Sequence, residues 1–329
     1  VMVMGGGLEP GQQRVVAVDG KGRFRLDDLP EGAYTLQVGA PAYARVVLEA
    51  RAGGEPVAIT LEKAVMISGR VMPDDPRIAL AGVTLIARPE ESPVIGRATQ
   101  ATTDDEGAFT FVGLAPGRYI IRFGGYGAPG GLMPIRVGPV DGGRDDVEVP
   151  LTYGHALTGT LVDGGGEPIT SLVRVEALGL TDEDQKDYDR RYFGTSTPEG
   201  TFTLEGLVPG RYTLSFDPIV KKDATALRGP RTTYVDNVAS GTTELVVTML
   251  EGLAVHGKLV DPEGKPITSR GGFVQVRPTG TPSGGQQAVM LTVDGEGRFR
   301  TPPLDTALTY HVYAGGFEGC MPTHVEGVV

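Results

Sequence analysis

The chain has 329 residues, a formal net charge of −11, a pI near 4.9 and a single cysteine, Cys320. Acidity without clustered Lys and Arg argues against nucleic-acid binding, and one cysteine excludes an internal disulfide or a cysteine-based metal site. Fifty Gly and 25 Pro beside 40% hydrophobic residues indicate a folded, turn-rich, all-β protein. We expect Cys320 to be buried as a small hydrophobic residue. No apolar run reaches the ~20 residues of a membrane-spanning helix.

The first predicted element in chain order is the segment GRFRLDDLPEGAY, and its pattern recurs three more times. Its copies are Gly22–Tyr34, Gly107–Tyr119, Gly200–Tyr212 and a diverged Gly297–Tyr310. Alternating apolar residues predict a strand, Pro-Gly predicts a tight turn, and the tyrosine begins the next strand. We call the four parts of the chain that contain this repeat copies one to four.

Other predicted strands surround the repeat. In copy three they cover an opening strand, two further strands and a closing strand, at residues 157–162, 171–178, 192–197 and 245–250. The opening strands carry a glycine, Gly69, Gly159 or Gly257, that precedes the glycine of the repeat by 38, 41 and 40 residues. The same spacing before Gly22 falls ahead of residue 1. The chain also stops before a closing strand of copy four, so we expect copies one and four to be incomplete in this sequence.

These spacings divide the chain into residues 1–62, 63–152, 153–251 and 252–329. The first range is expected to be a partial β-sandwich without its opening strand, and the last a partial one without its closing strand. Only a few residues separate a closing strand from the next opening strand, which restricts independent tumbling. The sequence therefore predicts a tandem array of about seven-stranded Ig-like or prealbumin-like β-sandwiches in a semi-rigid rod. A propeller is disfavoured because its blades repeat every ~40–50 residues.

The combined pattern, Gly-x-Val/Leu-x-Asp and later Asp-x-x-Gly-x-Phe with Pro-Gly-x-Tyr, resembles the carboxypeptidase regulatory-like domain. This transthyretin-like sandwich is found in tandem in bacterial surface proteins. The resemblance implies a non-catalytic structural, spacer or adhesive segment of a larger extracellular or cell-envelope protein. It implies no cofactor, and it implies other protein subunits or surface components as partners. Homo- or hetero-oligomers would form through β-edge or end-to-end contacts.

Two alternatives stay open beside the structural interpretation. A glycan- or peptide-binding module would need exposed aromatic side chains on one face, for which Tyr188, Tyr192 and Tyr234 are candidates. The chain could also be an ancillary part of an exported enzyme whose catalytic domain lies outside this segment. A related adhesin domain carries a lysine isopeptide crosslink, but Lys258 should point outward if Leu259 faces the core.

The sequence predicts no catalytic, cofactor-binding or metal-ligating residue. We expect His155 and His256, each at the start of an opening strand, to pack or hydrogen-bond at the joints. The acidic groups at 104–106 and 294–296 are typical of hairpin turns. The acidic loop 181–191 lacks the Gly and Glu of an EF-hand, so a solvated loop is expected, with a weak cation site as the alternative. The glycine-rich segments 124–131 and 315–322 are expected to connect strands.

Overall fold

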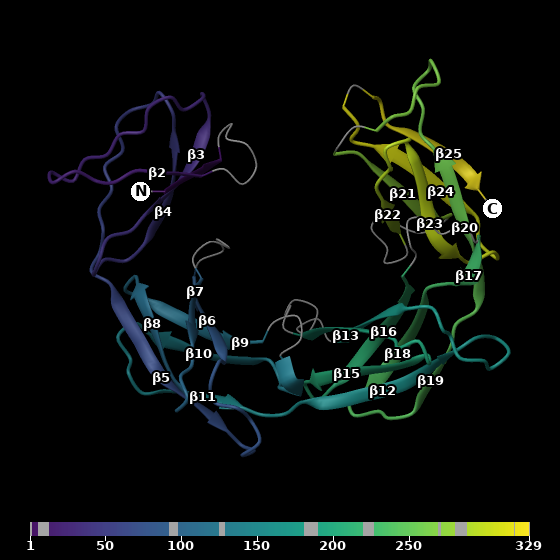
Figure 1. Cartoon of the computed structure of the whole chain (residues 1–329), viewed down its shortest axis with the longest axis horizontal. Coiled ribbons are helices and arrows are strands. Elements are labelled where there is room, and N and C mark those ends of the chain that lie inside the picture. The colour runs from purple at the N-terminus through teal and green to yellow at the C-terminus, as the bar shows by residue number, and fades with distance from the viewer. Residues whose placement is uncertain are drawn as a thin grey trace. The chain divides into compact units, whose positions relative to one another are not determined.

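A computed structural model describes most of the chain as β-strands (Figure 1). The described residues are 2–5, 13–91, 98–124, 129–180, 190–219, 227–268, 271–279, 288–318 and 320–328. Apart from one 3-10 turn, η1 at Pro129–Gly131, every regular element among them is a strand. The fold divides into two compact units, Val1–Gly154 and His155–Val329. The predicted all-β fold class is therefore confirmed.

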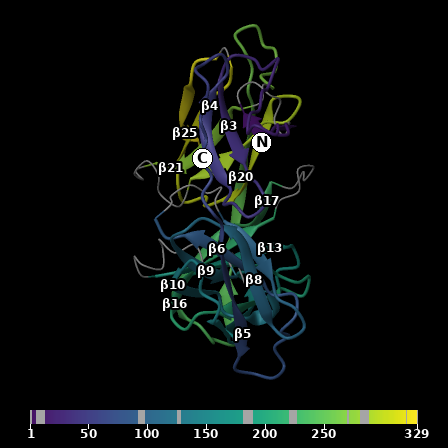
Figure 2. The same cartoon turned by 90° about the vertical axis from the view of Figure 1, so that its left-hand side faces the viewer.

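Copy two contains seven strands in two sheets. Its strands are β5 (Val65–Pro73), β6 (Thr84–Pro89), β7 (Thr99–Thr102), β8 (Ala108–Leu114), β9 (Arg118–Phe123), β10 (Ile135–Asp141) and β11 (Val147–Leu151). One sheet has the order β10-β9-β6-β7 and the other β11-β5-β8. The opening strand β5 is antiparallel to β8 and parallel to β11. Strands β5 and β8 lie side by side in both views (Figures 1 and 2).

Copy three repeats this topology strand for strand. Its strands are β12 (His155–Val162), β13 (Val173–Gly179), β14 (Arg191–Thr195), β15 (Thr201–Leu207), β16 (Arg211–Pro218), β18 (Thr233–Ala239) and β19 (Leu245–Thr248). The sheet orders are β14-β13-β16-β18 and β15-β12-β19. All of these strands except β18 are predicted from the sequence. The apolar residues of β18, Tyr234, Val235, Val238 and Ala239, do not alternate, because its pairing with β16 contains a register shift.

Copies one and four each contain one four-stranded sheet of the same kind. In copy one, β1 (Met2–Gly5), β2 (Gln13–Val15), β3 (Ala33–Val38) and β4 (Val46–Arg51) pair in the order β2-β1-β3-β4. In copy four, β21 (Phe273–Pro278), β22 (Val289–Leu291), β24 (Tyr310–Gly315) and β25 (Thr323–Val328) pair in the order β22-β21-β24-β25. A second sheet of copy four joins β17 (Arg228–Pro230), β20 (Glu251–Lys258) and β23 (Arg298–Leu304).

The buried side chains form four separate clusters, one within each copy. In copy three the alternation of β16 buries Tyr212, Leu214 and Phe216 while the residues between them face outward. Phe216 packs edge-to-face on Phe202 of β15, at 5.2 Å between ring centroids, which joins the two sheets. Each such buried large side chain stabilises the fold by roughly 1.5–3 kcal/mol.

The glycines of the opening strands β5 and β12 allow the neighbouring strands to approach closely. A Cβ added at Gly159 would lie 2.2 Å from the carbonyl oxygen of Leu245 and 2.7 Å from the ring of Phe202. At Gly69 the equivalent carbonyl, that of Val147, would lie at 1.9 Å. Because the contacts with Leu245 and Val147 are to backbone atoms, a side chain at either glycine would push the closing strand away.

The tyrosine of the repeat anchors the turn that precedes it. The Tyr212 hydroxyl donates a hydrogen bond to the carbonyl of Val208 at 2.7 Å, and Tyr119 and Tyr34 donate to the carbonyl four residues upstream in the same way. In copy four the turn has one more residue, and Tyr310 reaches back five residues to Asp305 at 3.1 Å. The bond therefore persists when the turn sequence changes.

We predict that Gly159→Ala weakens pairing between β12 and β19, because the added methyl group overpacks against backbone. Amide hydrogen exchange of β19, measured by mass spectrometry, should accelerate by at least tenfold. Gly164→Ala is the matched control, because its Cβ would find its nearest neighbour at 4.0 Å. Equal exchange in the two variants would contradict the close-approach argument.

We further predict that Tyr212→Phe destabilises copy three by about 1 kcal/mol, the net value of one lost hydrogen bond at a half-buried site. Exchange protection of the β16 amides should fall about fivefold. The control is Tyr43→Phe, because Tyr43 is 43% exposed. Unchanged protection in Tyr212→Phe would show that the hydroxyl contact does not stabilise the turn.

Candidate functional site

The acidic groups before the repeats of copies two and four stabilise turns. Asp104 accepts hydrogen bonds from the backbone N–H groups of Glu106 and Ala108, at 3.0 and 2.8 Å. Asp294 accepts in the same way from Glu296 and Arg298. These side-chain-to-backbone bonds hold the pKa of Asp294 below its usual value. The interpretation of 104–106 and 294–296 as turn residues is confirmed.

Three further turns use an aspartate in this way. Asp19, Asp163 and Asp261 each accept from backbone N–H groups two and four residues later, at 2.7–3.1 Å. A short carboxylate side chain can reach these donors without leaving its own turn. With Asp104 and Asp294, five carboxylates that could have bound an ion therefore accept hydrogen bonds from backbone N–H groups.

Lys258 points outward as predicted, whereas the role of His155 and His256 at the joints stays a prediction. His155 Nδ1 lies 2.9 Å from the hydroxyl of Ser240, an exposed contact within copy three. His256 and Lys258 are both exposed on β20. No group of three His, Cys, Asp or Glu residues could hold a metal ion within the described ranges.

Two sequence-based expectations are wrong. Cys320 is exposed, because it lies in the connection after β24, where the Phe317 ring takes the buried position instead. Tyr192 is only 1% exposed and packs edge-to-face on Tyr212 at 5.8 Å, so it belongs to the core and to no exposed aromatic face. Tyr234 is 40% exposed. Tyr188 lies outside the described residues, as does most of the acidic loop 181–191.

The glycine-rich segments connect strands, as predicted. Gly124 and the η1 turn lie between β9 and β10, and Gly315 ends β24 ahead of β25. Residues 125–128 and 319 are outside the described ranges.

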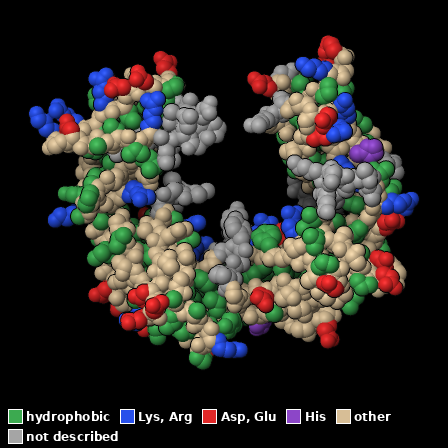
Figure 3. All heavy atoms as spheres, in the orientation of Figure 1, with side chains coloured by type: hydrophobic (Ala, Val, Ile, Leu, Met, Phe, Trp, Pro, Cys, Tyr) green, Lys and Arg blue, Asp and Glu red, His purple; other side chains and the backbone are tan. Residues whose placement is uncertain are grey.

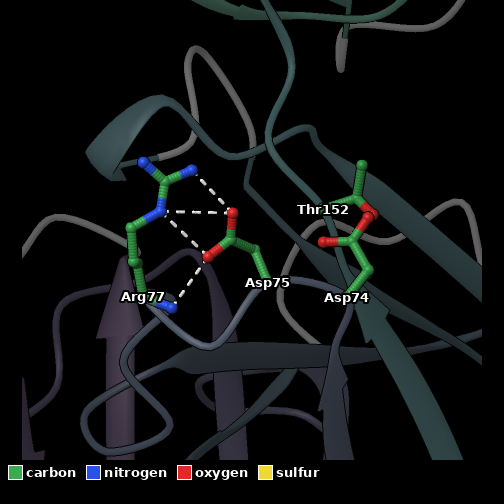
Figure 4. A network of polar contacts seen from close by, with 4 residues as sticks. All are labelled: Asp74, Asp75, Arg77 and Thr152. Carbon is green, nitrogen blue, oxygen red and sulfur yellow. Dashed lines mark hydrogen bonds and ion pairs between the residues drawn. The ribbon is translucent and has the colours of Figure 1, made fainter.

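A polar network ties the end of copy two to its opening strand (Figure 4). The Thr152 hydroxyl donates to the Asp74 carboxylate, and the Asp74 N–H donates to the carbonyl of Leu151 at 3.1 Å. Asp75 accepts from the guanidinium of Arg77, with an N–O distance of 2.6 Å. These contacts fix the chain immediately before copy three begins.

Backbone contacts hold the following residues to the same unit. The Met133 N–H donates to the Thr152 carbonyl, and the Gly154 N–H donates to the Gly131 carbonyl, both at 2.9 Å. The Arg77 guanidinium also lies over the ring of Tyr153 at 5.6 Å, a favourable cation–π geometry. The three residues 152–154 therefore belong structurally to the unit that ends at Gly154.

Copy three and copy four are joined by a strand, β17, that comes from copy three and pairs with a sheet of copy four. β17 lies in the long connection from β16 to β18, yet it pairs antiparallel with β20, matching Arg228 with Leu253 and Pro230 with Glu251. Next to it, the partly buried Arg231 forms an ion pair with Asp305. This pair joins a residue before β18 to one after β23.

A hollow of about 670 Å³ lies beside that ion pair. Among its lining residues, Asp217 accepts hydrogen bonds from the hydroxyls of Thr232 and Ser215, at 2.9 and 3.3 Å. Burial first, and then the negative charge of Asp217, raises the pKa of Tyr234. The polar groups of the hollow thus bind one another. On the described part of the face in Figure 3, acidic and basic side chains are scattered in small groups.

No family model and no curated protein matches the chain. Among solved structures, the Bacillus anthracis TIE protein is 16% identical, with 90% of this chain and 55% of that one covered and a TM-score of 0.23. This chain therefore spans little more than half the length of that protein. The carboxypeptidase regulatory-like resemblance stays a prediction.

Two pilins are also similar. A streptococcal ancillary pilin is 12% identical over 80% of this chain and 95% of its own, with a TM-score of 0.22. The minor pilin GBS52 of Streptococcus agalactiae is 15% identical over 59% of this chain and 99% of its own, with a TM-score of 0.31.

We predict that Asp75 titrates far below an ordinary aspartate, because hydrogen bonds from Arg77 lower its pKa to about 2. The folded pKa is lower than the unfolded one, so the stabilisation is complete above about pH 4. It is lost as the pH falls towards 2. NMR titration of the Asp75 carboxyl carbon should give this midpoint, and Arg77→Ala should raise it.

Thr152→Ala is the matched control for this titration, because Thr152 contacts Asp74 and leaves the Asp75 pair intact. A midpoint near 3.9 in the unmodified chain, the ordinary value for aspartate, would contradict the assignment of the shift to Arg77.

Proposed function

We propose that this chain is a non-catalytic structural segment of a larger bacterial cell-envelope or extracellular protein, serving as a spacer or adhesive part. Its domains are two β-sandwiches at residues 63–152 and 153–251, flanked by partial β-sandwiches at residues 1–62 and 252–329. Its partners are other protein subunits or surface components, reached through β-edge or end-to-end contacts.

One observation carries this proposal: the side chains that could take part in binding or catalysis instead stabilise turns and joints. Asp19, Asp104, Asp163, Asp261 and Asp294 all bind backbone N–H groups. Tyrosine hydroxyls hold the turns of all four repeats. Repeated domains whose aspartate and tyrosine side chains stabilise their turns are suited to a protein that bears load or sets a distance.

The joint between copies three and four supports the same function. These two copies share the β17–β20 ladder. A bonded joint limits the independent motion of the domains that it connects. A spacer needs this property, whereas a chain of freely tumbling domains would not hold a fixed length.

The surface location rests on the resemblance carried by the Pro-Gly-x-Tyr repeats. It is tested by labelling cells that produce the protein with antibodies raised against this chain. We predict labelling of intact cells, and release of fragments of the chain when those cells are treated with an external protease.

An antibody against a cytoplasmic protein is the control, and it should label permeabilised cells only. If the chain were also labelled only after permeabilisation, the proposed location would be wrong.

A further inference from the structure

The outward face of the four-stranded sheet of copy two carries three arginines at its centre. Strands β6, β9 and β10 of this sheet lie side by side in Figures 1 and 2. Arg88 lies on β6, Arg122 on β9 and Arg136 on β10, and each points away from the core in the alternation of its strand. Arg136 lies directly opposite Arg122, and Ile86, two residues before Arg88, lies on the other side of Arg122. We call Arg88, Arg122 and Arg136 the arginine face.

Arginines this close on one face repel one another. Residues directly opposite on antiparallel strands have Cβ atoms about 4.5–5.5 Å apart, and like charges there destabilise a sheet. Within the described part of the chain, the Arg88 and Arg136 side chains form no ion pair or hydrogen bond. The acidic groups at the end of this face, Glu90 and Asp141, lie 3.4 and 4.0 Å from Arg118 instead. Arg88 and Arg136 therefore carry charge that this sheet does not neutralise.

The fold does not require the opposed arginine pair. In every copy the same two positions are the third residue after the tyrosine of the repeat and the residue opposite it on the next strand. They hold Gln37 and Val47 in copy one, Ser215 and Tyr234 in copy three, and Tyr313 and His324 in copy four. All of these copies form the same four-stranded sheet. The arginine pair is thus specific to copy two, and binding of an anion explains it better than folding does.

Neutral polar and apolar residues complete the arginine face. Ile86 and Ile120 lie between the arginines, and Ile120 is only 6% exposed although it faces outward. Apolar surroundings lower the local dielectric, which strengthens the attraction between a guanidinium group and an anion. Beside Ile86, the edge strand β7 adds the exposed amide of Gln100 and the exposed hydroxyl of Thr102. The sheet therefore presents guanidinium groups for oxyanions next to neutral groups that can bond hydroxyls.

We propose that the arginine face of copy two binds an acidic polysaccharide. Planar guanidinium groups bind the carboxylates of uronic-acid units through paired hydrogen bonds, and Gln100 and Thr102 bond the sugar hydroxyls. Single-stranded nucleic acid fits less well, because its bases stack on aromatic side chains, and the aromatic residues of β9, Tyr119 and Phe123, are buried in the core. This inference rests on the proposed function, because it names a surface component that an adhesive segment would bind.

Fluorescence anisotropy measures this binding with the whole chain and a labelled decasaccharide of uronic acid at low salt. We expect saturable binding that weakens as salt is added, because exposed charges are screened. A neutral dextran decasaccharide should not bind. The net charge of −11 repels an anionic probe, so binding requires a local group of positive charges.

Two double variants locate the site. Arg88→Gln combined with Arg136→Gln removes two charges from the arginine face and should weaken binding by at least about tenfold, because charge-assisted hydrogen bonds are lost. The matched control is Arg70→Gln combined with Arg144→Gln, which removes the same charge from the same copy. Both control arginines form ion pairs elsewhere in copy two, so this variant should bind like the unmodified chain. Circular dichroism checks that both variants keep their strands.

Gln100→Ala tests the contact with the sugar itself. It leaves every charge in place and should weaken binding of the decasaccharide about fivefold, the effect of one lost hydrogen bond. Binding of a decaglutamate peptide, which offers carboxylates without hydroxyls, should be weaker than that of the decasaccharide and should not change in this variant.

Four results would overturn the proposed site. They are the absence of saturable binding at low salt, equal binding of the neutral dextran, equal loss of affinity in the two double variants, and tighter binding of decaglutamate or of a DNA decamer than of the decasaccharide. Labelling of intact cells depends on none of these side chains, so the proposed function and this site fail separately.

Discussion

The three-stranded sheets of copies two and three depend on backbone pairing of their opening strands. Each opening strand lies between the strand of the repeat and the closing strand, so it provides the only link between them in the sheets β11-β5-β8 and β15-β12-β19. Its glycine brings the neighbours close enough to bury the core. In copy one, residues 22–29 have the repeat sequence but form no strand. Alternating apolar residues therefore need a backbone partner before they become a strand, because an isolated strand leaves its N–H and C=O groups unpaired.

The four-stranded sheets are less dependent on that strand. Copies one and four both retain a buried tyrosine in the strand after the turn, Tyr34 and Tyr310, with its hydroxyl bonded to a carbonyl upstream. The bond is local in sequence, so it forms without the rest of the sandwich. Such local contacts cost little loop-closure entropy. Each copy thus combines one sheet built around a local turn with another that requires pairing between distant residues.

Much of this fold could be predicted from the sequence, because the repeat fixes the positions of Phe, Pro-Gly and Tyr in each copy. The turn role of Asp104 also followed from its residue type. The exposure of Cys320 and the burial of Tyr192 did not, since neighbouring residues decide which side chain takes a buried position. β17 was missed because Arg228-Gly229-Pro230 has no apolar alternation. It is a strand only because its backbone pairs with that of β20.

The pairing of β17 with β20 shows how a strand from one copy can complete a sheet of another copy. β17 comes from the connection that follows β16 in copy three, but its hydrogen-bonding partner is the opening strand of copy four. One half of the β20 edge is thus already occupied by a strand from another copy, although that strand lacks the apolar pattern of a closing strand. β17 therefore joins this sheet through its backbone ladder with β20 and not through an alternating apolar pattern.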